Sequence, residues 1–91
     1  DLVAVAARVY TAGTTGTCDV QIRNITQEAD MLTTKITIDS AELDSSTAAT
    51  AAVIDTLNDD VATGDGIAID VDAIHTTAAK GLFVELQFSL P

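Results

Sequence analysis

The chain has few aromatic residues and no partner for its one cysteine. Its 91 residues include only three aromatics, Tyr10, Phe83 and Phe88, and no tryptophan. The core must therefore be built from aliphatic side chains, which bury less area than aromatic rings. Cys18 is the single cysteine, so no disulfide can form within the chain. Small domains with thin cores usually recruit a metal or a partner, and we expect self-association here.

Basic residues are also scarce. Four Lys and Arg residues stand against 14 Asp and Glu residues, which gives a net charge of −10. The basic residues are scattered, whereas binding to a nucleic-acid backbone requires clustered Lys and Arg. Nucleic acid is therefore not an expected partner. In a symmetric oligomer the acidic side chains would have to point outward, be neutralised by a cation or meet a basic partner.

Long apolar runs are absent. No run approaches the roughly 20 residues that a helix needs to cross a bilayer, so no transmembrane segment or membrane partner is expected. The N-terminal residues lack the charged and apolar regions of a signal peptide. The chain begins at Asp1 and not at Met, and we expect a processed product or a portion of a longer one. Its length predicts a single domain over residues 1–91.

Alternation of apolar and polar residues is the dominant pattern, and it is strongest near the C-terminus. Ile67, Ile69 and Val71 alternate with smaller or acidic residues. Further on, every second residue is large and apolar in the series Leu82, Val84, Leu86, Phe88 and Leu90. Successive side chains of a strand point to opposite faces, so each segment predicts a strand with one apolar face. These two strands are expected to form the inner layer of the fold.

Three further segments alternate in the same way. Their predicted inward residues are Val3, Val5, Ala7 and Val9, then Cys18, Val20 and Ile22, then Ile36 and Ile38. Asp19, Gln21 and Arg23 are expected to face outward. The glycine-containing stretch 13–16 between the first two segments predicts that they form a hairpin. Residues 24–32 are expected to be a loop leading into a short edge segment, and residues 40–46 a turn.

The segment 47–63 fits two interpretations. Its larger apolar residues fall at spacings that place them on one face of a helix: Val53 and Ile54 are adjacent, Leu57 follows three residues later and Val61 four residues after that. In that case a residue of 44–46 would be the N-cap. The many threonines and the surrounding strands favour instead a strand near 51–55, followed by a loop through 58–60. Helix and strand both remain open for residues 47–57.

The pattern as a whole predicts an all-β protein. We count six to seven strands and at most one short helix. Turn signals about ten residues apart and strands with one apolar face favour an antiparallel β-sandwich of jelly-roll-like form. A partly closed barrel is the structural alternative.

No constellation of residues predicts catalysis. His75 is the only histidine, and no serine, cysteine or carboxylate accompanies it in a known arrangement, so we interpret it as a loop residue. Cys18 faces inward in its predicted strand and is expected to be a buried, unreactive thiol. Asn24-Ile25-Thr26 matches the glycosylation triplet, which is frequent by chance. We therefore expect a protein that is not an enzyme.

An acidic group offers the only candidate ligands for a metal. Asp55, Asn58, Asp59, Asp60 and Asp65 carry the oxygen atoms that calcium prefers. The segment 58–66 does not have the spacing of an EF-hand loop. A solvated acidic loop without a cofactor is the favoured interpretation, and a calcium site is the alternative.

Several segments resemble small virion proteins of tailed bacteriophages. The resemblance lies in Lys-Ile-Thr-Ile-Asp-Ser at 35–40, in residues 45–56 and 58–65, in Ile-Asp-Val-Asp-Ala at 69–73, and in Ala-Lys-Gly-Leu-Phe-Val at 79–84. Such proteins occur as capsid decoration, or cement, proteins and as domains of head fibres or tail proteins. The similar segments all follow Gly16, and they are structural rather than catalytic.

The resemblance implies an architectural function on the outer capsid surface of the virion. Proteins of this kind often assemble as trimers and bridge neighbouring major capsid proteins, and the same partners are expected here. Residues 1–11 would be the contacting strand, through Val3, Val5, Arg8 and Tyr10, by addition to a neighbour's sheet. Binding only to the assembled lattice stabilises it by mass action.

The resemblance also allows a receptor-binding module of a head fibre or tail that recognises a host-surface glycan. Sugar binding usually relies on exposed aromatic faces, and only Tyr10 and Phe83 are expected to offer them. This scarcity favours the decoration function. A calcium-dependent adhesion module, which would rest on the acidic loop alone, is the third class.

Overall fold

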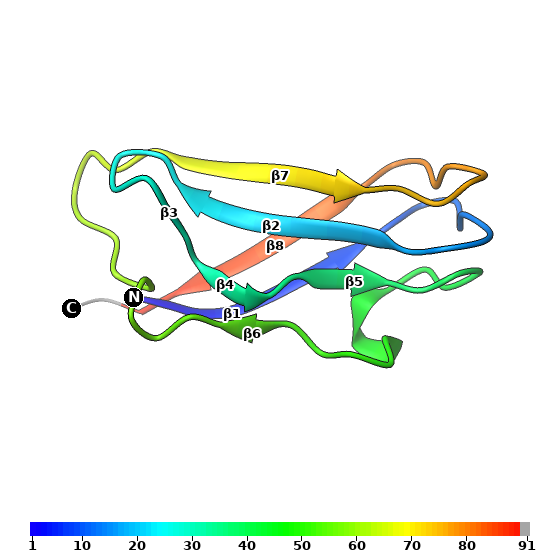
Figure 1. Ribbon diagram of the computed structural model, residues 1–91, viewed down its shortest axis with the longest axis horizontal. Coiled ribbons are helices and arrows are strands. Elements are labelled where there is room, and N and C mark those ends of the chain that lie inside the picture. Colours follow the sequence, from blue (N-terminus) through cyan, green and yellow to red (C-terminus); the bar gives the residue numbers. More distant parts are fainter. Residues whose placement is uncertain (90–91) are drawn as a thin grey trace.

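The computed structural model describes residues 1–89 and is built almost entirely of strands (Figure 1). In chain order these are β1 (Leu2–Arg8), β2 (Cys18–Asn24), β3 (Ala29–Asp30), β4 (Leu32–Thr34), β5 (Ile36–Ile38), the 3₁₀ helix η1 (Ser45–Thr47), β6 (Val53–Ile54), β7 (Ile67–Ala73) and β8 (Phe83–Phe88). All strand pairs are antiparallel, which confirms the predicted class. Residues 1–89 hold eight strands, which is more than the six to seven expected. Two of them, β3 and β6, are only two residues long and too short to show an alternating pattern.

Strand β2 is the centre of the larger sheet. It pairs with β7 along one edge and with β5 and β3 along the other. Its predicted inward residues, Cys18, Val20 and Ile22, are all buried. The expectation that β7 and β8 form the inner layer is wrong. Within residues 1–89 each of them pairs with one strand only, so one edge of each lacks a neighbouring strand.

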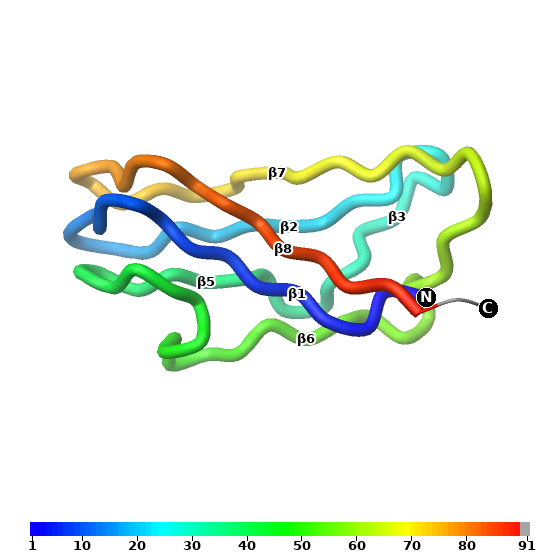
Figure 2. The backbone as a smooth tube through the Cα atoms, turned by 180° about the vertical axis from the view of Figure 1, so that it is seen from behind, coloured from blue at the N-terminus to red at the C-terminus, as the bar shows by residue number. Residues whose placement is uncertain are grey.

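Strand β1 pairs with β8, although the two are separated by most of the sequence. Val5 lies opposite Leu86, and Arg8 lies opposite Phe83. The hairpin predicted between β1 and β2 is therefore wrong. The segment that joins them pairs instead with the segment before β8, where the Thr14 N–H donates to the Thr77 carbonyl oxygen at 3.0 Å. Figure 2, seen from behind relative to Figure 1, shows β1 and β8 side by side.

The core lies between the β1–β8 pair and the sheet centred on β2. Its buried apolar residues are Leu2, Ala7, Val9, Cys18, Val20, Ile22, Met31, Leu32, Ile36 and Ile38. Every core residue is aliphatic or sulfur-containing, as the scarcity of aromatic residues suggested. All three aromatic rings are exposed, including Phe88, which was expected on the apolar face of its strand. Val84 and Leu86 of β8 pack against this cluster. Leu90, predicted to share their face, lies outside the described residues.

The segment 47–57 contains a strand and no α-helix. Val53 and Ile54 form β6, which pairs with β4 through Leu32 opposite Ile54. The strand interpretation is therefore confirmed in a shortened form. Asp44 caps only the short η1, where its carboxylate accepts a hydrogen bond from the Ser46 N–H at 2.8 Å.

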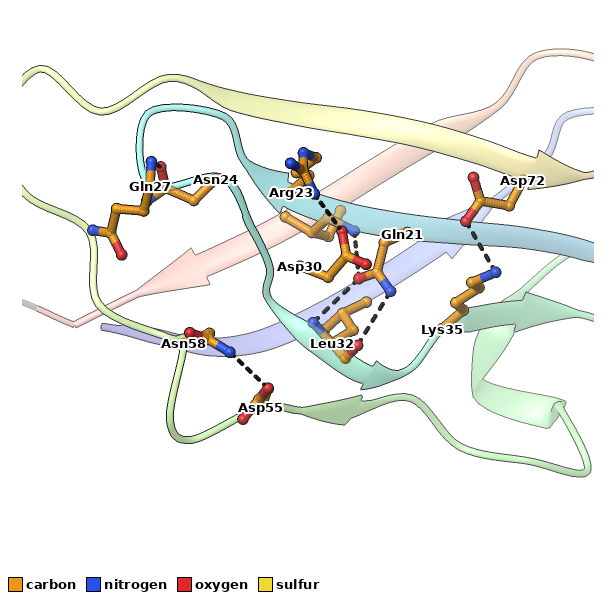
Figure 3. A network of polar contacts seen from close by, with 11 residues as sticks. Gln21, Arg23, Asn24, Gln27, Asp30, Leu32, Lys35, Asp55, Asn58 and Asp72 are labelled. Carbon is orange, nitrogen blue, oxygen red and sulfur yellow. Dashed lines mark hydrogen bonds and ion pairs between the residues drawn. The ribbon is translucent and has the colours of Figure 1, made fainter.

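Gln21 was predicted to face solvent, and it is buried with 5% of its surface exposed. The chain leaves the edge of β2 at this point, because β4 turns away to pair with β6. The Gln21 side chain takes the place of a strand partner (Figure 3): its Nε2 donates to the Leu32 carbonyl oxygen, and its Oε1 accepts from the Leu32 N–H, both at 3.1 Å. The same Oε1 accepts from the Ile22 N–H at 3.0 Å. The Gln21 amide thus supplies the hydrogen bonds that a paired strand would otherwise make along this edge of β2. The alternation of residues in the sequence does not show that this partner is missing.

Candidate functional site

The five predicted calcium ligands do not form one group. Asp55 and Asn58 belong to a local turn, in which Asn58 Nδ2 donates to Asp55 Oδ2 at 2.9 Å (Figure 3). Asp55 Oδ1 also accepts from the Leu57 N–H at 3.0 Å. Hydrogen bonds to neighbouring protein groups thus occupy both oxygens of Asp55, so this pair serves to shape the turn after β6.

Asp65 lies in a separate network with the loop that follows β2. Its Oδ2 accepts hydrogen bonds from Asn24 Nδ2 at 3.0 Å, from Gln27 Nε2 at 2.9 Å and from the Ala62 N–H at 2.9 Å. These donors, led by Asn24, lower the pKa of Asp65 below its ordinary value of 3.8. The Asp65 carboxylate therefore ties the loop before β7 to the end of β2.

Asp59 and Asp60 lie beside a residue that sequence reasoning did not include. Their carboxylate oxygens and that of Asp1 lie within 4.8 Å of one another. Hard cations accept such oxygen ligands, and these three residues are the group that could hold one. Their approach results from the pairing of β1, since the Leu2 N–H donates to the Asp59 carbonyl oxygen at 2.8 Å. A contact between residue 1 and residue 59 leaves no local signal in the sequence.

Two residues with reactive side chains are enclosed. Cys18 is buried, as predicted, and burial, followed by the charge of Asp19, raises the pKa of its thiol. His75 lies in a loop, as predicted, but only 1% of it is exposed. Its Nε2 lies 3.3 Å from the Asp39 carbonyl oxygen, while its buried Nδ1 has no hydrogen-bond partner among the described residues. Neither side chain is open to a substrate.

Asn24, the acceptor position of the glycosylation triplet, is also enclosed. It is 1% exposed, and its Nδ2, the atom that would carry a glycan, donates to Asp65. A glycan at this atom would break that contact. The folded protein is therefore not a substrate at this triplet.

A depression beside η1 is lined by small side chains. Its lining residues are Val5, Ala6, Ser45, Ser46, Ala48, Ala51 and Ala52. This lining has no charged or imidazole group to take part in acid–base chemistry. The Ser45 hydroxyl is already engaged, since Ser45 Oγ accepts from the Ala7 N–H at 3.0 Å.

The predicted contact residues of β1 differ in exposure. Val3 is 52% and Tyr10 89% exposed, whereas Val5 packs against the core. Arg8 is exposed and forms an ion pair with Asp44 at 3.4 Å. The edge of β1 away from β8 is partly occupied, because the Ala7 N–H bonds to Ser45 and the Val9 N–H to the Leu43 carbonyl oxygen. Strand addition is therefore easier at other edges.

Two residues of β7 on the core side of the sheet remain about half exposed. Ile69 lies opposite Ile22, and Val71 lies opposite Val20. Residues directly opposite in an antiparallel pair point to the same face, so all four face the core side of the sheet. Ile22 and Val20 are 0% exposed, yet Ile69 is 48% and Val71 46% exposed. The β1–β8 pair covers β2 and leaves this part of β7 uncovered.

We call the uncovered residues and the neighbouring edge the open flank. It consists of Ile69 and Val71 of β7 and the edge of β8 that faces away from β1. Figure 2 shows β8 running between β1 and β7, with its other edge on the β7 side. Sequence alternation identified the apolar face, but it could not show that nothing lies over it.

No known protein family, no curated protein and no solved structure matches this chain. No helix among residues 1–89 is both long and apolar enough to cross a bilayer.

Proposed function

We propose that this protein is a structural component of a tailed-phage virion that decorates the capsid surface and stabilises it by bridging major capsid proteins. The sequence resemblance supplies the class of protein. The observation that carries the architectural function is the open flank, where apolar side chains that belong to the core side of a sheet remain half exposed. Apolar surface of this kind is typical of a protein that functions in an assembly.

The charge distribution supports a partner on the exterior of a particle. Of the acidic residues near the open flank, Asp70 and Asp72 lie on the opposite face of β7, where Lys35 Nζ contacts Asp72 Oδ2 at 3.0 Å (Figure 3). The apolar face and the acidic face of the same strand are thus separated. An assembly formed through the apolar face keeps the acidic side chains in water, where like charges are screened.

The stabilising mechanism is mass action. A protein that binds the assembled lattice, and not its separated subunits, stabilises the lattice by RT ln(1 + [L]/Kd) at each site. With the ligand at 100 times its Kd this is about 2.7 kcal/mol per site. Many copies acting together then resist pressure from the packaged genome.

Capsids prepared without this protein provide the test. Added purified protein should co-sediment with them, saturate at a fixed copy number per capsid and raise the temperature at which they open. A parallel sample with unassembled capsid subunits should show no binding. Absence of co-sedimentation with the capsids would refute the decoration function.

One observation favours the glycan-binding alternative. Tyr10 is 89% and Phe83 59% exposed, and they lie near each other, since Arg8 pairs with Phe83 and the Tyr10 N–H donates to the Gly81 carbonyl oxygen at 3.2 Å. Two exposed aromatic rings are the groups on which sugars stack. Binding to host-surface glycans that is lost in Tyr10→Ala, together with no capsid binding, would establish this alternative instead.

A further inference from the structure

We propose that copies of this chain assemble by adding β7 of one copy to the open edge of β8 in the next, so that the added strand covers Ile69 and Val71. This inference identifies the self-association surface and rests on the architectural function proposed above. The occupant is a second copy, because this chain itself carries both halves of the contact.

The backbone of β8 is ready to accept a strand. The Ser89 N–H donates to the Asp1 carbonyl oxygen at 2.8 Å, and the Gly81 carbonyl oxygen accepts from the Tyr10 N–H. Odd-numbered residues of this segment therefore direct their backbone groups toward β1. Successive residues of a strand direct these groups to opposite edges, so Val84, Leu86 and Phe88 present theirs at the open edge.

The backbone of β7 is ready to donate the strand. The Gly66 carbonyl oxygen accepts from the Ile25 N–H at 2.9 Å, and the Ile22 carbonyl oxygen turns away from β7 to accept from the Met31 N–H at 2.7 Å. Even-numbered residues at the start of β7 thus face β2. Ile67, Ile69 and Val71 direct their backbone groups to the free edge. On β7 and on β8 alike, the residues whose backbone groups point to the free edge also have side chains on the core side of their sheet. When the two edges pair, these side chains therefore lie on the same face.

The strand directions allow the contact to repeat. β7 and β8 run in opposite directions along the body (Figure 1). Rotation of a copy about an axis parallel to the strands keeps these directions, so β7 of the next copy arrives antiparallel to β8. Each copy has one edge of each kind, and such head-to-tail contacts form a ring when the rotation between copies closes and a filament when it does not. The three-fold ring expected from the sequence is compatible with this contact.

Charge selects the register. If Leu86 lay opposite Ile69 of the next copy, Glu85 would lie opposite Asp70. If Leu86 lay opposite Val71, Glu85 would lie opposite Asp72. Like charges directly opposite each other are destabilising. With Leu86 opposite Ile67, Glu85 lies opposite the uncharged Ala68, and this is the register that we propose.

The same register places apolar residues together on the covered face. Val84 lies opposite Ile69 of the next copy, and both have backbone groups that face the shared edge. Glu85 and Ala68 then form a pair without direct backbone hydrogen bonds between them, in which the two Cα atoms are about 4.5 Å apart. That separation is within the range that a disulfide bridges.

A disulfide between copies tests this pairing. The variant Glu85→Cys with Ala68→Cys, made in a Cys18→Ala background, should form covalent multimers under mild oxidation. The largest closed species should contain the number of chains found by light scattering for the unmodified protein, in multiples of 9.4 kDa. The matched control is Gln87→Cys with Ala68→Cys, a pair that lies opposite only in the excluded register with Glu85 opposite Asp70. It keeps both of those charges and should cross-link several-fold less. Equal or stronger cross-linking in the control, or none in the test variant, would overturn the pairing.

A charge placed on the covered face gives a second, independent readout. Ile69→Glu should reduce the mass in solution to that of one chain, whereas Ile74→Glu, at an isoleucine that is 65% exposed and outside β7, should leave it unchanged. Circular dichroism of both variants verifies that the strands remain. An Ile69→Glu variant that stays multimeric would refute the inference. Multimers that cross-link as expected but do not bind capsids would refute the proposed function and leave the pairing established.

Discussion

The buried amide of Gln21 should be one of the most sensitive positions in the protein. In Gln21→Leu the side chain keeps its approximate size but loses every hydrogen bond. The Leu32 N–H, the Leu32 carbonyl oxygen and the Ile22 N–H then lose the partners that Gln21 provides. Leu32 and Ile22 are buried, so water cannot replace the amide without local opening.

The expected loss follows from these three groups. A buried polar group left unpaired costs about 1–3 kcal/mol, and the additional apolar side chain offsets part of the total. We expect a decrease of roughly 3–5 kcal/mol in the free energy of unfolding. A chain of this length has a free energy of unfolding of roughly 5–14 kcal/mol in total, so the substitution should remove a large part of it.

Urea denaturation followed by circular dichroism measures this loss, at one protein concentration because association shifts the midpoint. At an m-value of about 1 kcal/mol per M, the midpoint should fall by roughly 3 M or more. The control Gln87→Leu changes an exposed glutamine of β8 and should alter the free energy by less than about 0.5 kcal/mol. A decrease below about 1 kcal/mol for Gln21→Leu would refute the reasoning.

A charged variant separates hydrogen bonding from packing. Gln21→Glu keeps an acceptor oxygen for the two N–H groups but places a second oxygen against the Leu32 carbonyl. The carboxyl group can donate to that oxygen only when it is protonated, so its pKa in the folded variant should rise. Relative to the unmodified protein at the same pH, the variant should therefore recover stability as the pH falls. Equal destabilisation at all pH values would contradict the assigned donor.

Three further predictions concern loops. Gly13→Ala should destabilise the protein by about 1–3 kcal/mol, because a Cβ at this position would approach the ring atom His75 Cγ to 2.5 Å; His75→Ala removes the ring and should relieve part of that loss. The pKa values of Asp44 and Asp65 are lowered by hydrogen bonds, so their contribution is complete well above pH 3.8 and is lost as the pH falls through the folded values. The urea midpoint should decrease on acidification from about pH 5, and less so in Asp65→Asn. Asp60→Asn should raise the midpoint, most clearly at low salt, by removing one of three neighbouring carboxylates; an unchanged midpoint would show that the three do not repel in solution.

Local alternation allowed much of the strand content to be predicted. The inward residues Val20 and Ile22 of β2, and Ile36 and Ile38 of β5, follow from a period of two and a buried face. The class of fold and the burial of Cys18 follow from the same pattern. Alternation is a property of one segment, however, and it carries no information about which strand lies beside it. The pairing of β1 with β8, and the position of β2 at the centre, therefore could not be read from it.

For the candidate sites too, the sequence shows which side chains are present, and contacts between distant segments decide which of them lie together. The sequence shows that Asp55, Asp59 and Asp65 all carry carboxylate oxygens, but the structure places them in three different environments. Asp1 joins Asp59 and Asp60 only because the start of β1 is hydrogen-bonded to the segment between β6 and β7. The exposed state of Ile69 and Val71 depends on the width of the facing strand pair, which no property of β7 determines.

The sequence by itself determined an all-β, antiparallel domain with an aliphatic core, since side-chain periodicity and composition act locally and leave little choice. Only the tertiary structure decided which edges are paired, which polar group replaces a missing strand partner and which apolar face stays open. The physical reason is that these features arise from contacts between residues far apart in the chain. Their free energy depends on geometry that exists only after the chain has closed on itself.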